Sequence, residues 1–232
     1  TLEDFFDLSK AFSWGILPQG PRVAIVSNAG GPAVISADSI VENGLEMAEI
    51  DDETRKKLLE VLPRSASIMN PVDVLGDALA DRFVSASEIV LKNENCDALI
   101  VLLTPQIMTQ IKKTAEMIGE LSKKYNKPVF CSFIGGTLVA EGEKILNKMQ
   151  LPSFRFPERA IYALGKMWEF KKRQKESSYT QMDIYQVLNF DIMPEKINKI
   201  VKEAIEKKHE ALDNLEADIV ISAIGINTPP TL

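Results

Sequence analysis

Histidine and cysteine are nearly absent from this chain of 232 residues, which holds one histidine, His209, and two cysteines, Cys96 and Cys131. A structural zinc site needs about four Cys or His ligands, so the composition excludes one. Both cysteines lie in apolar, strand-like stretches, which excludes the disulfide framework of a small secreted domain. We expect a reducing cytoplasm, two inert thiols and no metal site.

Long apolar runs and a surplus of basic residues are also missing. The longest uncharged apolar stretch, Ala98 to Leu103, is far shorter than the roughly 20 residues that span a bilayer. Lys plus Arg number 27 and Asp plus Glu number 33, a net charge of −6. Surfaces that bind nucleic acid are basic. The sequence therefore predicts neither a membrane nor a nucleic-acid partner, and the residues from Thr1 onward do not lead us to expect a secretory signal.

What the chain does contain is an alternation of strand-like and helix-like segments. Apolar runs predict strands at 22–27, 45–50, 96–103, 129–134 and 153–156. Helical patterns lie between and after them, at 32–43, from 51 onward, and at 79–93, 106–125, 137–149 and 157–173, while 63–77 is typical of a loop. This alternation predicts an α/β fold with a doubly wound, mostly parallel, flavodoxin-like sheet and a helical C-terminal extension.

Three parts follow from this pattern. Residues 1–20 are expected to form a lead-in helix from a preceding domain, and 21–173 the flavodoxin-like domain. Residues 174–232 are expected to hold a polar linker (174–190), one amphipathic helix from Pro194 to about Leu215, and the start of a further domain. We expect the chain to be a piece of a longer protein.

Open α/β sheets bind ligands at the carboxyl ends of their strands, so the candidate loops are 27–32, 70–77, 104–107 and 134–137. The loop from Ser27 to Pro32 joins a strand end to a helix N-terminus through Asn28, Ala29, Gly30 and Gly31. Free backbone N–H groups and the helix dipole suit a phosphate or carboxylate there, and Asn28 would add an amide. We expect Gly31 as N-cap and Pro32 as the first helical residue.

Each candidate has a plainer explanation. The 27–32 loop lacks the spacing of a dinucleotide fingerprint and the Walker lysine, so an ordinary βα turn fits it too. Asp73 would bind substrate or orient a loop, or form an Asx turn. The central strand is followed by Thr104, Pro105 and Gln106. These residues would either face a ligand or only connect the strand to the next helix. The turn Gly135-Gly136 is either a second anion site or a helix start with Thr137 as N-cap.

His209 lies between Lys207-Lys208 and Glu210, which favours a surface position on the late amphipathic helix over a catalytic base. No Ser/His/Asp or Cys/His arrangement can be built, because residues 21–173 contain no histidine. We expect no catalytic residue in this chain.

Five segments, in order, resemble one family: Arg-Val-Ala-Ile-Val-Ser-Asn-Ala-Gly-Gly-Pro-Ala (22–33), Glu-Asn-Gly-Leu (42–45), Asn-Pro-Val-Asp-Val-Leu-Gly (70–76), Leu-Thr-Pro-Gln (103–106) and Pro-Glu-Arg-Ala (157–160). The resemblance is to the NDP-forming acyl-CoA synthetases, the ADP-forming acetyl-CoA synthetases of the succinyl-CoA synthetase superfamily. It covers about residues 1–173, and the tail from Glu216 resembles the start of that family's ATP-grasp region.

The resemblance implies an acid–CoA ligase that interconverts acid, CoA and ATP with acyl-CoA, ADP and phosphate through a phosphohistidine. The family's Ser-His-Thr-Gly motif is absent here, so that histidine would lie outside this chain. The domain would pack on the phosphohistidine loop and help form the acyl and phosphate site. The residues implied there are Asn28, Ala29, Gly30, Gly31, Asp73, Thr104, Pro105, Gln106, Gly135 and Gly136. Thr104 to Gln106 replace a glycine-rich carboxylate loop, which indicates an acid other than succinate.

This chain alone is expected to bind no cofactor, whereas ATP/ADP, Mg²⁺ and CoA are implied for the full enzyme. The implied partners are its CoA-binding, phosphohistidine and ATP-grasp domains, a small carboxylic acid, and further copies in a homo-oligomer. An alternative is a non-catalytic, ligand-sensing domain fused to a protein acetyltransferase. A receiver-like signalling domain is disfavoured, because the first strand ends in Ser27-Asn28 and not in an acidic cluster that would hold Mg²⁺.

Overall fold

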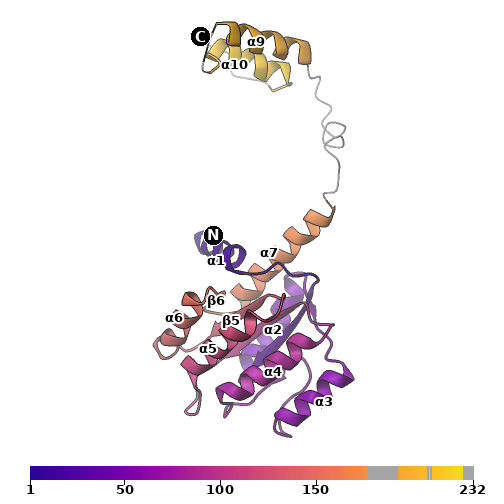
Figure 1. Cartoon of the computed structure of the whole chain (residues 1–232), viewed down its shortest axis with the longest axis vertical. Helices are drawn as coiled ribbons and strands as arrows, with labels where there is room; N and C mark the ends of the chain where they lie inside the picture. Colours follow the sequence, from indigo (N-terminus) through magenta and orange to yellow (C-terminus); the bar gives the residue numbers. More distant parts are fainter. Residues whose placement is uncertain (177–192, 208, 210, 227–232) are drawn as a thin grey trace. The chain divides into compact units, whose positions relative to one another are not determined.

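The computed structural model describes residues 1–176, 193–207, 209 and 211–226, and the chain divides into two units, Thr1–Lys175 and Glu176–Leu232. The first unit is a sheet covered by helices (Figure 1). Its elements are α1 (Leu2–Trp14), β1 (Arg22–Ser27), α2 (Gly30–Glu42), β2 (Glu46–Met47), α3 (Asp52–Val61), β3 (Val72–Asp73), α4 (Ala80–Lys92), β4 (Ala98–Leu103), α5 (Ile111–Ser122), β5 (Val129–Phe133), a 3₁₀ turn (Gly136–Leu138), α6 (Ala140–Lys148), β6 (Ser153–Phe154) and α7 (Pro157–Glu176).

All the strand pairs are parallel, in the order β2-β1-β4-β5-β6, and β3 also pairs with β1. Arg22 of β1 lies opposite Glu46 and Val26 lies opposite Val72, so β2 and β3 follow one another along the same side of β1. The predicted α/β, flavodoxin-like class is confirmed. The strand order reverses between β1 and β4, which makes their carboxyl ends the topological switch point.

Helices cover the sheet on both faces. One core cluster joins side chains of β4 and β5 to α3, α4, α5 and α6, and the other joins them to α1, α2 and α7. Every residue of β4 is buried, which explains its continuous apolar sequence. Burial on both faces therefore fixes β4 at the centre of the domain.

One side chain completes the outer edge of β1. Asn70 accepts a hydrogen bond from the Ile25 N–H (2.9 Å) and donates to the carbonyls of Val23 (2.8 Å) and Ala48 (3.0 Å). The expected strand at 45–50 shrinks to Glu46–Met47, and β3 forms inside a segment expected to be a loop. The Asn70 amide bonds the β1 backbone between these two short strands, so no longer strand is needed there.

The amino ends of β1 and β4 are joined by an ion pair. Arg22 donates from Nε to Asp97 Oδ2 (2.8 Å) and from Nη2 to Oδ1 (2.9 Å), and its backbone N–H donates to Oδ2 (3.1 Å). A Cβ on Gly20 would lie 2.3 Å from Asp97 Oδ2, so a larger residue there would have to displace the Asp97 carboxylate from this pair. Burial alone would raise the pKa of Asp97, but the hydrogen bonds from Arg22 outweigh it and hold that pKa below its usual range.

Several predicted helix boundaries are wrong. Ala29 and not Gly31 is the N-cap of α2, and Pro32 is its third residue. The helix ends at Glu42 with Asn43 as C-cap, and Gly44 follows with a φ of +69°. The helix expected at 106–125 begins at Ile111, because Thr109 accepts a hydrogen bond from the Gln106 N–H (2.9 Å) and holds a loop there. Thr137 lies inside the 3₁₀ turn and is not an N-cap.

The second unit differs from the single helix expected there. α9 (Pro194–Glu206) ends before the predicted apolar stripe does, and α10 (Asn214–Ala223) begins at a capping box formed by Asp213 and Glu216. His209 lies between the helices with Nδ1 3.3 Å from Glu216 Oε2, so its expected place on a helix is wrong. α7 takes up the first residues of the expected linker, and 177–192 and 227–232 lie outside the described residues.

None of the helices that the structure describes has the length and apolar character needed to cross a membrane.

The Asp97→Asn variant should unfold more easily at pH 7, by about 1–2 kcal/mol, since it removes a charged hydrogen-bond partner of an arginine that is 37% exposed. The folded pKa of Asp97 is lowered, so its contribution is complete above the unfolded pKa of about 3.9 and disappears as the pH falls through the folded pKa. Urea unfolding of both proteins between pH 7 and pH 2 measures this. Asp38→Asn, at an exposed position on α2, is the control, and a difference in unfolding free energy between Asp97→Asn and the parent that stays constant down to pH 2 would contradict the assignment.

The Asn70→Ala variant should lose roughly 3 kcal/mol or more of unfolding free energy, because three buried backbone groups lose their partner. Asn147→Ala, at an exposed position on α6, should change it little. Equal urea midpoints for the two variants would show that the Asn70 amide does not hold β1.

Candidate functional site

The loops that follow β1 and β4 are joined by Asn28. Its Nδ2 donates to the Thr104 carbonyl (2.8 Å), and its Oδ1 accepts from the Thr104 N–H (2.8 Å) and hydroxyl (3.3 Å). The side chain is 4% exposed and lies at the switch point between the two strands. Asn28 therefore acts first as a clamp between loops, a role that its position in the sequence did not reveal.

The loops that follow β3, β4 and β5 also lie against one another. A Cβ on Gly135 would lie 2.6 Å from Cγ of Pro105, so this close approach requires glycine. A Cβ on Gly76 would make an ordinary contact, 3.6 Å, with Cγ of Gln106. The structure thus brings Thr104, Pro105 and Gln106 together with the glycine turns on either side.

The N-terminus of α2 opens beside this cluster. Gly30 and Gly31 are its first two residues, and the first helical hydrogen bond runs from the Ala33 N–H to the Ala29 carbonyl, so the two glycine N–H groups have no acceptor within the helix. A Cβ on either glycine would meet no described atom within 4 Å, and neither has a positive φ. Neither packing among the described residues nor backbone conformation requires glycine here.

Asp73 and Gly136 take local roles. Asp73 is paired in register with Ser27, and its Oδ1 accepts from the Leu75 N–H (2.8 Å) in an Asx turn that gives Leu75 a φ of +68°. Gly136 opens the 3₁₀ turn with a φ of +57°. The other carboxylate oxygen of Asp73, Oδ2, takes no part in the hydrogen bond of this Asx turn.

Exposed apolar side chains surround these loops, and sequence reasoning missed them. They are Val34 of α2, Ile107 and Met108 before α5, and Leu138 of the 3₁₀ turn. A cavity of about 410 Å³ lies between the start of α5 and Leu138. Two adjacent apolar residues, Ile107 and Met108, after the Thr104–Gln106 loop could have indicated an exposed apolar patch. The sequence pattern instead assigned both residues to a helix at 106–125.

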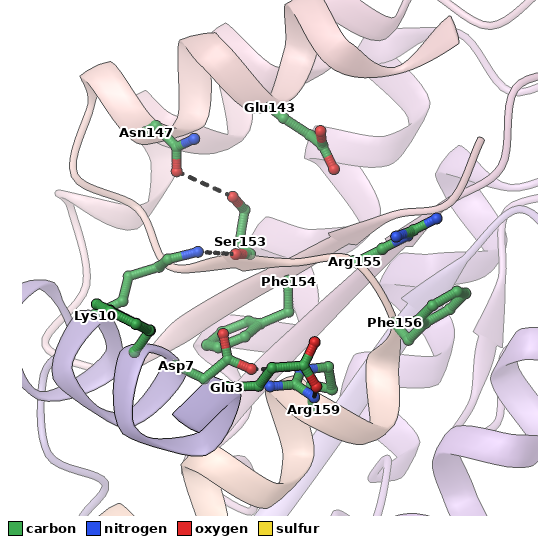
Figure 2. A pocket seen from close by; sticks show the side chains of 11 residues that line it. Glu3, Asp7, Lys10, Glu143, Asn147, Ser153, Phe154, Arg155, Phe156 and Arg159 are labelled. Carbon is green, nitrogen blue, oxygen red and sulfur yellow. Dashed lines mark hydrogen bonds and ion pairs between the residues drawn. The ribbon is translucent and has the colours of Figure 1, made fainter. Parts of the chain in front are cut away.

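A larger cavity, about 500 Å³, lies away from the predicted loops, beside β6. Figure 2 shows that α1, α6 and the start of α7 line it. Its charged side chains include Asp7, Lys10, Glu143, Arg155 and Arg159. None of these had been predicted as a site residue.

Neither cysteine offers a nucleophile. Burial raises the pKa of the Cys96 thiol to about 11, and burial also raises the pKa of Cys131. Both thiols are therefore protonated and inert at neutral pH.

Residues 23–176 match the family model described as the Ligase-CoA domain. The 4-hydroxybutyrate–CoA ligase (ADP-forming) of Nitrosopumilus maritimus is 34% identical over 229 residues, 99% of this chain and 32% of that protein. The alpha subunit of acetate–CoA ligase (ADP-forming) II of Pyrococcus furiosus is 33% identical over 171 residues, 71% of this chain and 37% of that protein. The chain thus spans about a third of the length of these relatives.

A solved structure is similar as well. The acetyl-coenzyme A synthetase 1 of Ca. Korarchaeum cryptofilum, described as dinucleotide forming and in complex with phosphate and ADP, aligns with a TM-score of 0.72 and 31% identity. The alignment covers 78% of this chain and 40% of that one.

The Asn28→Ala variant should lose about 2–4 kcal/mol of unfolding free energy, because the N–H and carbonyl of the half-buried Thr104 lose their partner. Gln106→Ala, in the same group of loops but with an exposed side chain, serves as the control in urea unfolding. An Asn28→Ala protein as stable as this control would show that the clamp does not contribute to folding.

Proposed function

The chain belongs to the Ligase-CoA domain family, and from this premise we propose that it forms part of an ADP-forming acid–CoA ligase. That enzyme would interconvert acid, CoA and ATP with acyl-CoA, ADP and phosphate through a phosphohistidine outside this chain. Relatives named as ADP-forming CoA ligases, 34% and 33% identical, support the general activity. The part proposed for this domain is to pack on the phosphohistidine loop and to help form the acyl and phosphate site.

The observation that carries this proposal is the open N-terminus of α2. The substrate acid, the phosphoryl group and phosphate are all anions, and each would be stabilised by the Gly30 and Gly31 N–H groups and the helix dipole. The first turn of α2 contains no acidic residue that would repel them. Glycine at both positions leaves an anion room to reach the backbone.

The Asn28–Thr104 clamp would hold this anion site in shape. Because Nδ2 of Asn28 carries two hydrogens and the Thr104 carbonyl takes one, the second N–H could bond a ligand while the clamp stays closed. Pro105, Gln106, Gly135 and Gly136 would form its wall. The exposed Val34, Ile107, Met108 and Leu138 would pack against the domain that carries the histidine.

ATP/ADP, Mg²⁺ and CoA would be bound by other domains of the enzyme. Among the described residues no group of three His, Cys, Asp or Glu side chains is placed to hold a metal ion. Asp73 is the single carboxylate among the proposed site residues, and one of its oxygens is engaged in the Asx turn.

The second unit would lead into the ATP-grasp region. The match to the separate alpha subunit of Pyrococcus furiosus covers 71% of this chain, whereas the match to the Nitrosopumilus maritimus ligase covers 99%. The two units divide at Lys175. These observations support a junction near residues 174–176.

In the ligase that contains this domain, Gly31→Glu should lower kcat for acyl-CoA formation by about 100-fold, since a carboxylate would occupy and neutralise the anion site. The 232-residue chain should fold unchanged, because a side chain at Gly31 has open space. Steady-state kinetics and thermal melting measure the two effects.

The matched control is Val41→Glu, which places the same charge at an exposed position near the other end of α2. If Gly31→Glu and Val41→Glu enzymes had the same kinetics as the parent, the proposed anion site would be wrong.

A further inference from the structure

Helix α1 turns a mixed face toward the domain, on which Asp7 and Lys10 lie beside the buried Ala11 and the core-packed Leu8. Phe5 and Phe6 are 63% and 62% exposed, whereas the Asp7 side chain is only 18% exposed. Among the residues of α1, all of which the structure describes, Ala11 is the one that is buried. A helix held by the hydrophobic effect alone would turn its phenylalanines toward the core.

Arg159, in the first turn of α7, meets the acidic side chains of α1 (Figure 2). Its Nε donates to Asp7 Oδ2 (2.5 Å) and its Nη1 donates to Glu3 Oε2 (3.1 Å). Asp4 Oδ1 lies 4.0 Å from Nη2. Arg159 is 29% exposed, so these pairs are screened less than pairs on the open surface.

A second polar contact ties α1 to the edge of the sheet. Lys10 Nζ donates to the carbonyl of Ser153 in β6 (2.8 Å) and lies 5.2 Å from the centre of the Phe154 ring. Figure 2 shows Lys10 and Asp7 reaching from α1 toward β6 and Arg159. These polar contacts add to the packing of Leu8 and Ala11 against the core and to the contact of the Phe12 ring with Phe170 of α7, whose centres lie 5.5 Å apart.

We infer that Arg159 is a positioning residue that fixes the orientation of α1, with Asp7 toward α7 and with Phe5 and Phe6 outward. The segment Pro157–Ala160 supplies each part of this joint: Pro157 begins α7, Arg159 meets α1, and Ala160 is buried in the core below. The joint decides which surface α1 presents, independently of the anion site at α2.

The test is hydrogen exchange, followed by mass spectrometry, on the whole 232-residue chain. In Arg159→Gln the amides of Leu2–Trp14 should exchange at least about tenfold faster, while those of β4 and β5 keep their protection. Arg159→Lys, which keeps the charge, should restore part of the protection. The matched control is Arg173→Gln on the same helix, whose partner is Glu169 and not α1.

Salt separates an electrostatic joint from mere packing. Raising NaCl from 0.05 to about 1 M shortens the Debye length to about 3 Å and should speed α1 exchange in the parent protein but not in Arg159→Gln. Unchanged α1 exchange in Arg159→Gln, or salt-independent exchange in the parent, would overturn the inference.

If Arg159→Gln unfolds the whole domain, Asp7→Asn tests the same contact from α1. Faster exchange confined to α1 in that variant supports the joint, and parent-like exchange refutes it.

Discussion

The pairing of β1 with β4 is the interaction on which the rest of the domain depends. Five residue pairs run in parallel from Val23–Ala98 to Ser27–Leu102. Side chains close both ends, with Arg22 on Asp97 at the amino end and Asn28 on Thr104 at the carboxyl end. Because the chain turns outward in opposite directions from these two strands, every other strand is placed through them. A shift between β1 and β4 would therefore displace both halves of the sheet together.

At the carboxyl end of this pairing, the group that holds the loops together differs from the groups proposed to bind an anion. The amide of Asn28, which from sequence alone is the natural candidate to touch a ligand, is used to hold two loops in place. The donors left without a helical partner are main-chain groups, the N–H groups of Gly30 and Gly31. A main-chain site is positioned by the helix itself, so it needs no ordered side chain and loses no side-chain entropy when an anion binds. The Asn28–Thr104 bonds and the proposed anion site at Gly30 and Gly31 thus use different atoms of one short loop.

The sequence predicts best what burial alone determines. β1 matches its predicted range, β4 and β5 agree to within about two residues at each end, and the fold class follows, because two-sided burial leaves continuous apolar runs. The carboxyl-end loops could be named because topology places them. β3 and the late start of α5 could not be predicted. The bonds that Asn70 Oδ1 accepts from the Ile25 N–H and Thr109 Oγ1 accepts from the Gln106 N–H form only once the segments involved have folded. The partner of Asn28 is hidden for the same reason, being 76 residues away along the chain.

Helix periodicity has a further limit, which α1 illustrates. Apolar residues recur along α1 at helical spacing, but spacing alone does not say which of them turn inward. Hydrophobicity favours burial of Phe5 and Phe6, yet both are exposed, whereas the Asp7 side chain is 18% exposed. The charged partner of Asp7 is Arg159, which lies 152 residues away along the chain. The net charge of the chain does not reveal this contact. Arg159 reduces the mutual repulsion of three nearby acidic side chains, but a net charge does not say where in space such charges meet. The orientation of α1 is thus a tertiary property, which can be determined only when the positions of the opposing charges in space are known.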